Sequence, residues 1–485
     1  MRTKRDSNSE LMAEPNQTLS SRRWLITILL IAIIVRVVAA FYFGDRVVPI
    51  SGAYDQVSYD RLAQRVLDGY GFTFDKLWWP FTQAGEPTGH WSYLYTLYLV
   101  AVYGLVGYHP LAARLIQAIL AGVLMPWLVY RLGRRHFGTQ VGLLAGGLMA
   151  CYAYFIFYSA TLMTESFYII GVLCVLDLAG QLGQAGESSP AARRNGLLLG
   201  LALGVTILLR QVFLLFIPVL FAWLMWRSYR YQSNSGRAGL TVRENGAFEG
   251  STANPRGPAI HLRNNPVLRM TGVLVTATLV LLFTIAPWTV RNYLAFDRFV
   301  LLNTNAGFAF YWANHPINGR NFPAVLPTWS SYIELIPTDL LTLNEAELDQ
   351  ALLKRGFGFV RDDPGRYLML SISRIKEYFL FWPTSESGLI SNVSRMFSFG
   401  LLLPFMAYGL ISQGRRSFSS EMLILYLFII TYAAIHLLSW ALIRYRLPID
   451  AVLIIFASTA LVEIWMKLAP RQVEIHNIQI PKAEF

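Results

Sequence analysis

Long apolar runs repeat along most of this chain, and they constrain its fold more than any other feature. Most of them cover roughly 18–22 residues, enough for an α-helix to cross the hydrocarbon core of a bilayer. Of the 485 residues, 54% are hydrophobic and only 14% are charged, whereas a soluble protein carries about a quarter charged residues. The sequence therefore predicts an all-α polytopic integral membrane protein.

The formal net charge of +12 at pH 7 fits the same setting. Most of the excess Arg and Lys lies in loops, where basic residues orient membrane helices by staying in the cytoplasm. Because basic loops normally accompany membrane spans, no nucleic-acid partner is expected. The two cysteines, Cys151 and Cys174, lie inside apolar runs, which argues against a disulfide framework or a zinc site.

Basic residues at the ends of the runs predict the sidedness of the helices. Arg22 and Arg23 hold the start of the first run inside the cytoplasm, and the cluster Arg131–His136 holds the end of the second run inside. The stretch 44–110 is then external, both termini are cytoplasmic, and every later loop obeys the same rule. We expect a plasma (inner) membrane protein with about ten spans, at residues 24–43, 111–130, 141–158, 167–182, 197–209, 212–226, 270–288, 397–411, 422–440 and 447–466.

This topology divides the chain into five parts. They are, in order, a disordered cytoplasmic tail (1–23), an N-terminal transmembrane module (24–290), an extracytoplasmic loop or subdomain (291–392), C-terminal transmembrane helices (393–467) and a second cytoplasmic tail (468–485). Within the transmembrane module, residues 227–269 are rich in Arg, Gly, Ser and Asn and read as a flexible cytoplasmic linker.

Two segments of the first external loop, 44–110, are predicted to lie at the membrane interface. Residues 55–68 place their apolar side chains on one helical stripe, which is typical of an amphipathic helix in the headgroup plane. Residues 91–106 are apolar enough to cross the membrane. Counting them as a span would put the cluster Arg131–His136 outside, and their Trp and Tyr content is typical of an interfacial segment.

Two carboxylates, Asp55 and Glu165, are predicted at the external mouths of membrane helices. Carboxylates at that depth are expensive and usually functional. Asp55 is the candidate general base, although an Asp that begins a helix also serves as an N-cap. Glu165 is a candidate second base, acceptor-orienting group or cation ligand, or else an ordinary solvated loop residue. The pair would also suit a divalent cation, but no ligand set in the sequence specifies one.

Several external basic residues are candidates for binding a phosphate. The guanidinium group binds two phosphate oxygens at once, and external arginines run against the usual orientation bias. For each of them, a side chain snorkelling to the interface is the alternative. The candidates are Arg210, Arg446, Arg444, Arg291 and, as a proton donor or else a plain surface residue, His90.

Two further residues are candidates for supporting roles. Arg36 lies within the first span, where a charged side chain needs a polar partner. It is expected either to attach this span to another helix or to support the Asp55 loop. Tyr59 shares the helical stripe of Asp55, four residues away.

An ordered series of short motifs resembles the GT-C membrane glycosyltransferases, and within them the protein O-mannosyltransferases and lipid A aminoarabinose transferases (glycosyltransferase family 39-like). Two departures are Gln56, where many relatives carry an acidic residue, and Trp91-Ser92, where they often carry Pro-Pro. The motifs span most of the chain, from about residue 24 to 465. They are Asp55-x-x-x-Tyr59-x-x-Leu62-Ala63, Gly69-Tyr70-Gly71-Phe72, Ala113–Ala118, Tyr130–Gly138, Leu162-Met163-Thr164-Glu165-Ser166, Pro287–Tyr293 and Arg444-Tyr445-Arg446-Leu447-Pro448.

The resemblance implies a GT-C-like helical bundle and a glycosyltransferase (EC 2.4 class). Such an enzyme moves a hexosyl, mannosyl or pentosyl sugar from a polyprenyl-phosphate donor to a protein, lipid or glycan on the extracytoplasmic face, and inversion at the anomeric carbon is expected. The family's acidic residue in the first external loop corresponds to Asp55, and its acidic residue after the third span to Glu165. A lipid-linked sugar transporter or flippase remains as an alternative, because it would explain the external basic residues and the many spans. A non-catalytic GT-C-like subunit also remains, since Gln56 departs from the pattern.

Overall fold

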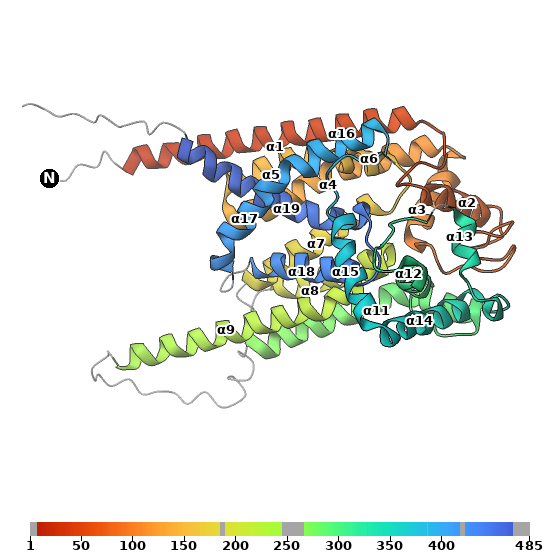
Figure 1. Cartoon of the computed structure of the whole chain (residues 1–485). Helices are drawn as coiled ribbons and strands as arrows, with labels where there is room; N and C mark the ends of the chain where they lie inside the picture. Colours follow the sequence, from red (N-terminus) through yellow and green to blue (C-terminus); the bar gives the residue numbers. More distant parts are fainter. Residues whose placement is uncertain are drawn as a thin grey trace, which may run out of the picture.

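The computed structural model describes residues 7–184, 190–244, 266–326, 328–385, 387–417 and 422–468. These residues form a bundle of long helices with shorter helices gathered at one end (Figure 1). No strand occurs in the described residues; two isolated β-bridges, Thr73 with Pro87 and Trp78 with Thr82, hold the first loop. The all-α fold class predicted from the apolar runs is confirmed.

Eight helices of the described residues are long and apolar enough to cross a membrane, and a bent pair makes nine. Their membrane-length parts are Ser20–Phe43 of α1 (Ser7–Phe43), α4 (Pro110–Phe137), Glu165–Gly183 of α7 (Glu165–Gln184), Ala192–Leu209 of α8 (Pro190–Leu209), Gln211–Tyr231 across η1 (Gln211–Phe216) and α9 (Ile217–Glu244), α11 (Pro266–Phe296), Leu389–Gly414 across α16 (Leu389–Arg395), η4 (Met396–Gly400) and α17 (Leu401–Ser417), and α19 (Ile443–Leu468).

The remaining predicted spans take other forms. Residues 141–158 fall in the bent pair α5 (Thr139–Cys151) and α6 (Ala153–Ala160), which meet at 54°. Residues 422–440 fall on α18 (Leu423–Leu438), an apolar helix of 16 residues that is shorter than the others. The predicted number of about ten is therefore close to the observed arrangement.

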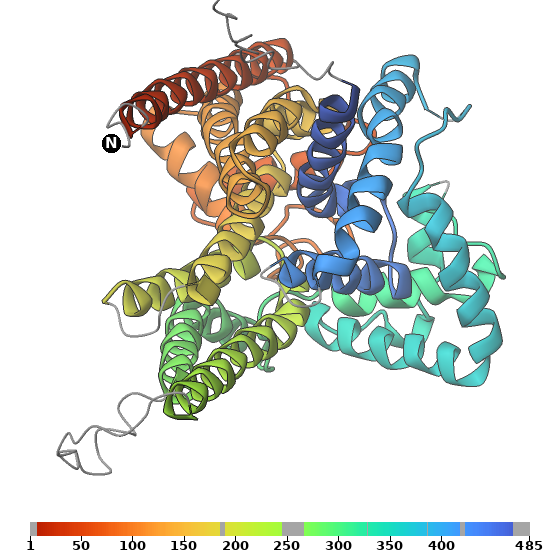
Figure 2. The same cartoon turned by 90° about the vertical axis from the view of Figure 1, so that its left-hand side faces the viewer.

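Helix α19 lies in the middle of the bundle and α1 at its edge (Figure 2). All residues from Arg446 to Ala460 on α19 are buried, because a helix that is apolar all round can be covered by protein on every side. Helix α1 instead leaves large apolar side chains such as Ile34 and Val38 exposed, as a lipid-facing helix does.

The shorter helices form the end of the molecule that carries the candidate site (Figure 1). Helix α2 packs beside α3, and α12 beside α14. The bounds of this layer are α2 Asp55–Leu67, α3 Tyr93–Val106, α12 Ala306–Asn314, η2 Pro316–Asn318, α13 Trp329–Glu334, η3 Thr338–Leu340, α14 Glu345–Asp362 and α15 Pro364–Tyr378.

Helix α3 covers most of the segment 91–106, which was predicted to be interfacial from its Trp and Tyr content. The structure supports the absence of a span but not that reason. The helix has 14 residues, fewer than a membrane span needs. Its tyrosines Tyr93, Tyr95 and Tyr103 are buried in the protein and do not line a headgroup belt. Their hydroxyls find protein partners, as buried phenols must: Tyr95 donates to Gln117 Oε1 at 2.7 Å.

Parts of the predicted tails and linker are helical. Helix α1 already begins at Ser7, so the stretch 1–23 is not disordered throughout; an apolar helix extends at little cost once it has formed. Helix α9 likewise continues to Glu244, into the predicted linker 227–269. Residues 1–6, 245–265 and 469–485 lie outside the described residues, and the last of these ranges is most of the predicted second tail.

Candidate active site

Asp55, Glu165, Arg210 and Arg444 meet in one ion network. Arg444 Nη1 lies 2.8 Å from Asp55 Oδ2, and Arg444 Nε lies 4.0 Å from Glu165 Oε1. Arg210 Nη2 donates to the same Oε1 of Glu165. The two predicted carboxylates are therefore linked through arginines that were predicted as phosphate ligands.

Each member of the network stands where a helix begins or breaks. Asp55 and Glu165 are the first residues of α2 and α7, where the helix dipole favours negative charge. Arg210 is the extended residue between α8 and η1, with φ −151°, and Arg444 lies in the first turn of α19. Such chain breaks allow polar side chains from four separate helices to reach one point.

Asp55 does not serve as the N-cap of α2. Tyr54 holds the N-cap position, in helical conformation, and no side chain caps the helix there. The Asp55 carboxylate points to Arg444 and is the most exposed of the four side chains, at 26%, whereas Glu165 is only 2% exposed. Asp55 is therefore the carboxylate that an incoming molecule reaches first.

Aromatic rings and a hydroxyl hold the two arginines in place. The Arg210 guanidinium lies 5.7 Å from the Tyr168 ring and 5.3 Å from the Tyr445 ring, and its Nε donates to Thr164 Oγ1 at 3.1 Å. The Arg444 guanidinium also lies 5.3 Å from Tyr445. Burial lowers the pKa of Arg210, but the Glu165 carboxylate more than offsets this and raises it above its usual value. The arginine stays charged.

Three buried polar atoms near this network find no hydrogen-bond partner within the described part of the chain. They are Glu165 Oε2, Arg444 Nε and Trp91 Nε1. Buried polar groups are nearly always paired, so each of these atoms has capacity left for a bound molecule or water. A carboxylate oxygen, a guanidinium N–H and an indole N–H together offer both acceptor and donor groups.

Tyr59 packs beside the network and does not enter it. Its ring contacts Trp91 and Tyr95 at centroid distances of 5.4 and 5.0 Å. Burial, and secondarily the Asp55 charge, raises the pKa of the Tyr59 phenol. The phenol therefore stays protonated and supports the start of α2, as its place on the stripe of Asp55 suggested.

His90 is held away from the role of proton donor. Its Nδ1 lies 3.1 Å from the Thr304 carbonyl oxygen, which only accepts, so Nδ1 carries the proton. Burial lowers the pKa of the ring below its usual value. A neutral His90 whose proton is already bonded to Thr304 is poorly suited to bind or protonate a phosphate, contrary to the interpretation from the sequence.

Arg291 braces the loop between α2 and α3. It donates through Nη1 to the Thr88 carbonyl and to the Tyr93 hydroxyl, both at 2.9 Å, and contacts the rings of Phe72 and Tyr93. Its donors are directed at protein groups, so the structure does not bring Arg291 to the ion network.

Arg446 and Arg36 are fully buried elsewhere. Arg446 Nε lies 2.9 Å from Asp450 Oδ1, one helical turn along α19, and Nη1 donates to the Tyr378 carbonyl. Arg36 donates to the Met149 and Ala150 carbonyls at the end of α5. Most of their donors bind protein groups, and only Arg446 Nη2 and Arg36 Nε have no partner among the described residues. Because Arg446 is completely enclosed beside Asp450, the structure does not bring it to the ion network, and Arg36 joins α1 to α5 instead of supporting the Asp55 loop.

Glu345 is a structural residue that the sequence interpretation missed. Its carboxylate accepts from the Gly89 N–H at 2.7 Å, from the Thr88 hydroxyl at 3.2 Å and from the Thr304 hydroxyl. It thereby joins the loop that carries His90 to helix α14. No short-range pattern signals this contact, because Gly89 and Glu345 lie far apart in the sequence.

No group of three or more His, Cys, Asp or Glu side chains that would suit a metal ion occurs in the described residues. Asp55 and Glu165 are instead neutralised by Arg444 and Arg210. The structure thus adds no support to the divalent-cation hypothesis.

The chain is similar in fold to a solved membrane oligosaccharyltransferase, and part of it matches a glycosyltransferase family model. Residues 92–240 match the family model of dolichyl-phosphate-mannose-protein mannosyltransferases. An oligosaccharyltransferase from Archaeoglobus fulgidus in the apo form is similar at 15% identity and a TM-score of 0.50, covering 92% of this chain and 51% of that one. The predicted resemblance to this superfamily is confirmed.

Two further solved structures are also similar. The same oligosaccharyltransferase in complex with Zn and sulfate matches at 16% identity and a TM-score of 0.50, covering 91% of this chain and 49% of that one. ArnT from Cupriavidus metallidurans bound to undecaprenyl phosphate matches at 15% identity and a TM-score of 0.36, covering 94% of this chain and 82% of that one. The present chain spans about half the length of the oligosaccharyltransferase. A search of the curated proteins finds no match.

Proposed function

We propose that this multi-pass membrane protein is a glycosyltransferase that moves a sugar from a polyprenyl-phosphate carrier to an acceptor on the extracytoplasmic face, with inversion at the anomeric carbon. The observation that carries the proposal is the network in which Arg444 joins Asp55 to Glu165 and Arg210. The family match over residues 92–240 and the fold support the donor class.

Asp55 is the general base in this proposal. The acceptor oxygen forms a bond to the anomeric carbon while the bond from that carbon to the phosphate oxygen breaks. The acceptor proton passes to the Asp55 carboxylate, and the electron pair of the broken bond leaves with the phosphate. Because the sugar is displaced in one step from the opposite side, its configuration inverts.

Arg444 and Arg210 bind the departing phosphate. Fixed guanidinium groups stabilise the charge that gathers there, and their planar fork matches phosphate oxygens. Arg444 at present contacts Asp55 at 2.8 Å. A phosphate that draws Arg444 toward itself leaves Asp55 free to accept a proton, so arrival of the donor activates the base.

Glu165 holds the arginines in this mechanism. It is buried at 2% exposure, and its Oε1 faces both guanidinium groups. Its Oε2 has no protein partner among the described residues and is directed to an acceptor hydroxyl in this proposal. The main role of Glu165 is thus to position Arg210 and Arg444, and its additional role is to orient the acceptor.

The test measures consumption of a labelled donor by the purified full chain. A panel of radiolabelled polyprenyl-phosphate sugars identifies the donor, and Asp55→Asn should then slow sugar release by about a hundredfold or more, since a general base contributes that much. Asp75→Asn is the matched control, because Asp75 lies in the same loop, pairs with Arg61 on the surface and is outside the network.

Two outcomes would contradict the proposal. Undiminished donor consumption by the Asp55→Asn protein removes this residue from the mechanism. Binding of donors by the wild-type chain without release of any sugar favours a transporter or a non-catalytic subunit.

A further inference from the structure

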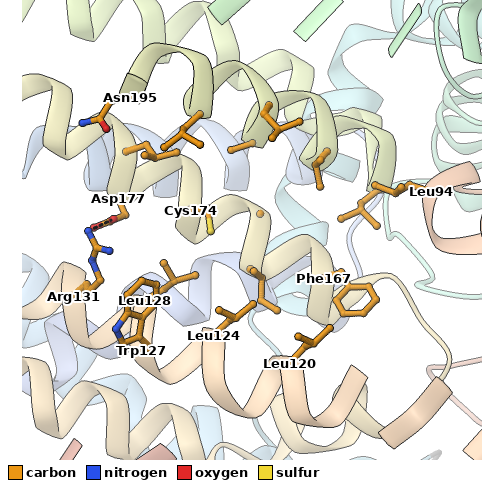
Figure 3. Close-up of a pocket in the computed structure, with 18 of the residues that line it drawn as sticks. Leu94, Leu120, Leu124, Trp127, Leu128, Arg131, Phe167, Cys174, Asp177 and Asn195 are labelled. Atoms are coloured by element: carbon orange, nitrogen blue, oxygen red, sulfur yellow. Dashed lines mark ion pairs between the residues drawn. The ribbon is translucent and has the colours of Figure 1, made fainter. Parts of the chain in front are cut away.

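A groove of about 900 Å³ runs between α4, α7 and α8, outside the ion network (Figure 3). Leucine, isoleucine, valine and aromatic side chains form most of its wall, among them Leu124, Ile170 and Leu198. All three helices are of membrane length. An apolar groove between such helices faces the hydrocarbon of the bilayer and fits an acyl chain.

The two ends of the groove differ in polarity. Figure 3 shows Arg131, Asp177 and Asn195 at one end and Leu94 and Phe167 at the other. The apolar end also includes Leu209, next to Arg210 in the sequence. A ligand of this groove therefore has a polar head at one end and a hydrocarbon chain that points toward the other.

The polar end carries more positive than negative charge. Arg131 Nη2 and Arg135 Nη2 share one carboxylate, Asp177, at 2.9 and 2.7 Å. Arg194 also lines the groove; its side chain is exposed and forms no ion pair within the described residues. Arg131 and Arg194 line this end, and Arg135 outside the lining already neutralises part of the Asp177 charge, so the end favours an anionic head. Guanidinium groups bind phosphate well.

We propose that the groove binds one anionic phospholipid, with its phosphate at Arg131 and Arg194 and an acyl chain along α4, α7 and α8. The polyprenyl-phosphate donor does not fit this pose. Glu165 and Asp177 are twelve residues apart on α7, about 18 Å at the rise of an α-helix, so one phosphate cannot occupy both ends. The inference does not rest on the proposed function.

A lipid in this groove connects to the ion network through the helices it touches. Helix α7 begins with Glu165, and α8 ends immediately before Arg210. The acyl chain fills the space between these two helices on the side of α4. The bound phospholipid thereby fixes the distance between the elements that hold Glu165 and Arg210.

Binding is measured on the purified full chain in detergent. Added phosphatidylglycerol should raise the thermal unfolding temperature, because a ligand that binds the folded state stabilises it, and native mass spectrometry should count one retained molecule. Zwitterionic phosphatidylcholine should have a much smaller effect, and salt should weaken the difference.

Arg194→Gln should weaken phosphatidylglycerol binding about tenfold, the effect of losing one charged contact to phosphate. Arg193→Gln is the matched control, since Arg193 is the exposed neighbour that does not line the groove. Ala202→Trp, which adds bulk to the apolar wall, should abolish retention of the lipid while Arg194 stays in place.

Three results would overturn the inference. They are equal stabilisation by phosphatidylcholine, equal loss of binding in the Arg193 and Arg194 variants, and stronger Arg194-dependent binding of undecaprenyl phosphate than of phosphatidylglycerol. The donor assay runs separately with the Asp55 variants, so a failed lipid test leaves the glycosyltransferase proposal standing, and the reverse also holds.

Discussion

At the scale of single residues, four of the arginines singled out from the sequence fall into two kinds. Arg444 and Arg210 are partly exposed, at 15% and 17%, and share the carboxylates of Asp55 and Glu165 near unpaired polar atoms. Arg446 and Arg36 are completely buried, and most of their donors bind protein groups, although Arg446 Nη2 and Arg36 Nε have no partner among the described residues. Only the first kind is exposed enough to meet a ligand.

The buried pair Arg446–Asp450 should therefore matter for stability and not for the donor. Arg446→Met or Asp450→Leu alone should lower the free energy of unfolding by about 3 kcal/mol or more, because each leaves an unpaired charge in an apolar site. The double variant should recover part of the loss. Thermal unfolding of the three proteins and their KM for the donor provide the measurement.

The double variant also loses the bond from Tyr152 to Asp450 and the bond from Arg446 to the Tyr378 carbonyl, so recovery is incomplete. If Arg446→Met leaves the unfolding temperature unchanged and raises the KM for the donor, Arg446 is a phosphate ligand after all, as the sequence predicted. The spacing of Arg446 and Asp450 was a signal in the sequence, since residues four apart face each other on a helix.

At the scale of elements, the bend between α5 and α6 is stabilised by a side chain from another helix. Helix α5 ends at Cys151, and the 54° bend before α6 leaves its last carbonyls without helical partners. Arg36 on α1 donates to two of these, at Met149 and Ala150. One arginine inside a membrane span thus stabilises a broken helix and attaches α1 to it.

Arg36→Met should destabilise this joint by about 2 kcal/mol or more, because the carbonyls lose charged hydrogen bonds inside the protein. The unfolding temperature should fall, and Cys151, exposed at the joint, should react faster with a maleimide. Ile34→Met is the control: Ile34 lies on the same helix and is 58% exposed. Equal effects of both substitutions would show that Arg36 has no special part in the joint.

The contact between α12 and α14 should depend on pH through Asp349. Its carboxylate accepts from the Gly307 and Phe308 N–H groups at 2.8 and 3.1 Å. Burial raises the pKa of Asp349 from 3.8 to about 7. Between these two values the folded state binds more protons than the unfolded state, so stability decreases as the pH rises from about 4 to about 7 and is constant above.

The pH dependence of the α12–α14 contact is measured by hydrogen exchange in α12, corrected for the intrinsic effect of pH on exchange. Protection should be higher at pH 5 than at pH 8 in the wild-type chain, and Asp349→Asn should remove most of the difference, since an amide does not titrate in this range. His315 also titrates in this region, but it is common to both proteins. The same pH dependence in both would mean that Asp349 stays ionised throughout.

The sequence predicted single helices better than the contacts between them. Apolar length predicted the membrane helices. The position of Asp55 and Glu165 at helix starts, and of Arg210 and Arg444 outside the spans, singled out all four members of the network but not their pairing. Tyr168 and Tyr445, which hold Arg210, were not singled out, because an aromatic residue in a membrane helix carries no local mark of its partner. His90 was misjudged because its partner, the Thr304 carbonyl, is distant in the sequence.

At the scale of the whole molecule, the ion network joins the starts of α2 and α7, the break after α8 and the start of α19. All four points lie at the end of the bundle that carries the short helices (Figure 1). Two carboxylates and two guanidinium groups there balance in charge, which allows the network to remain partly buried without a net charge. A phosphate would upset this balance and draw the arginines toward itself.

The proposed function requires this end of the molecule to be extracytoplasmic, because that is where the acceptor is expected. The bias of Arg and Lys predicts that the loop 44–110 lies outside and the end of α9 inside. Tyr70 in that loop and Tyr231 on α9 are equally exposed, at 61% and 59%, and so make a matched pair of reporters. The native residues Cys151 and Cys174 are first replaced by Ser and Ala.

In intact cells, Tyr70→Cys should react with a membrane-impermeant maleimide, whereas Tyr231→Cys should react only after permeabilisation. The reverse pattern would place Asp55 and Glu165 on the cytoplasmic side and exclude an extracytoplasmic acceptor. Because both reporters lie on the protein surface and are similarly exposed, a difference between them reports the membrane barrier and not local burial. Sidedness thus decides which pool of acceptors Asp55 meets, and with it the kind of glycosyl transfer this network can perform.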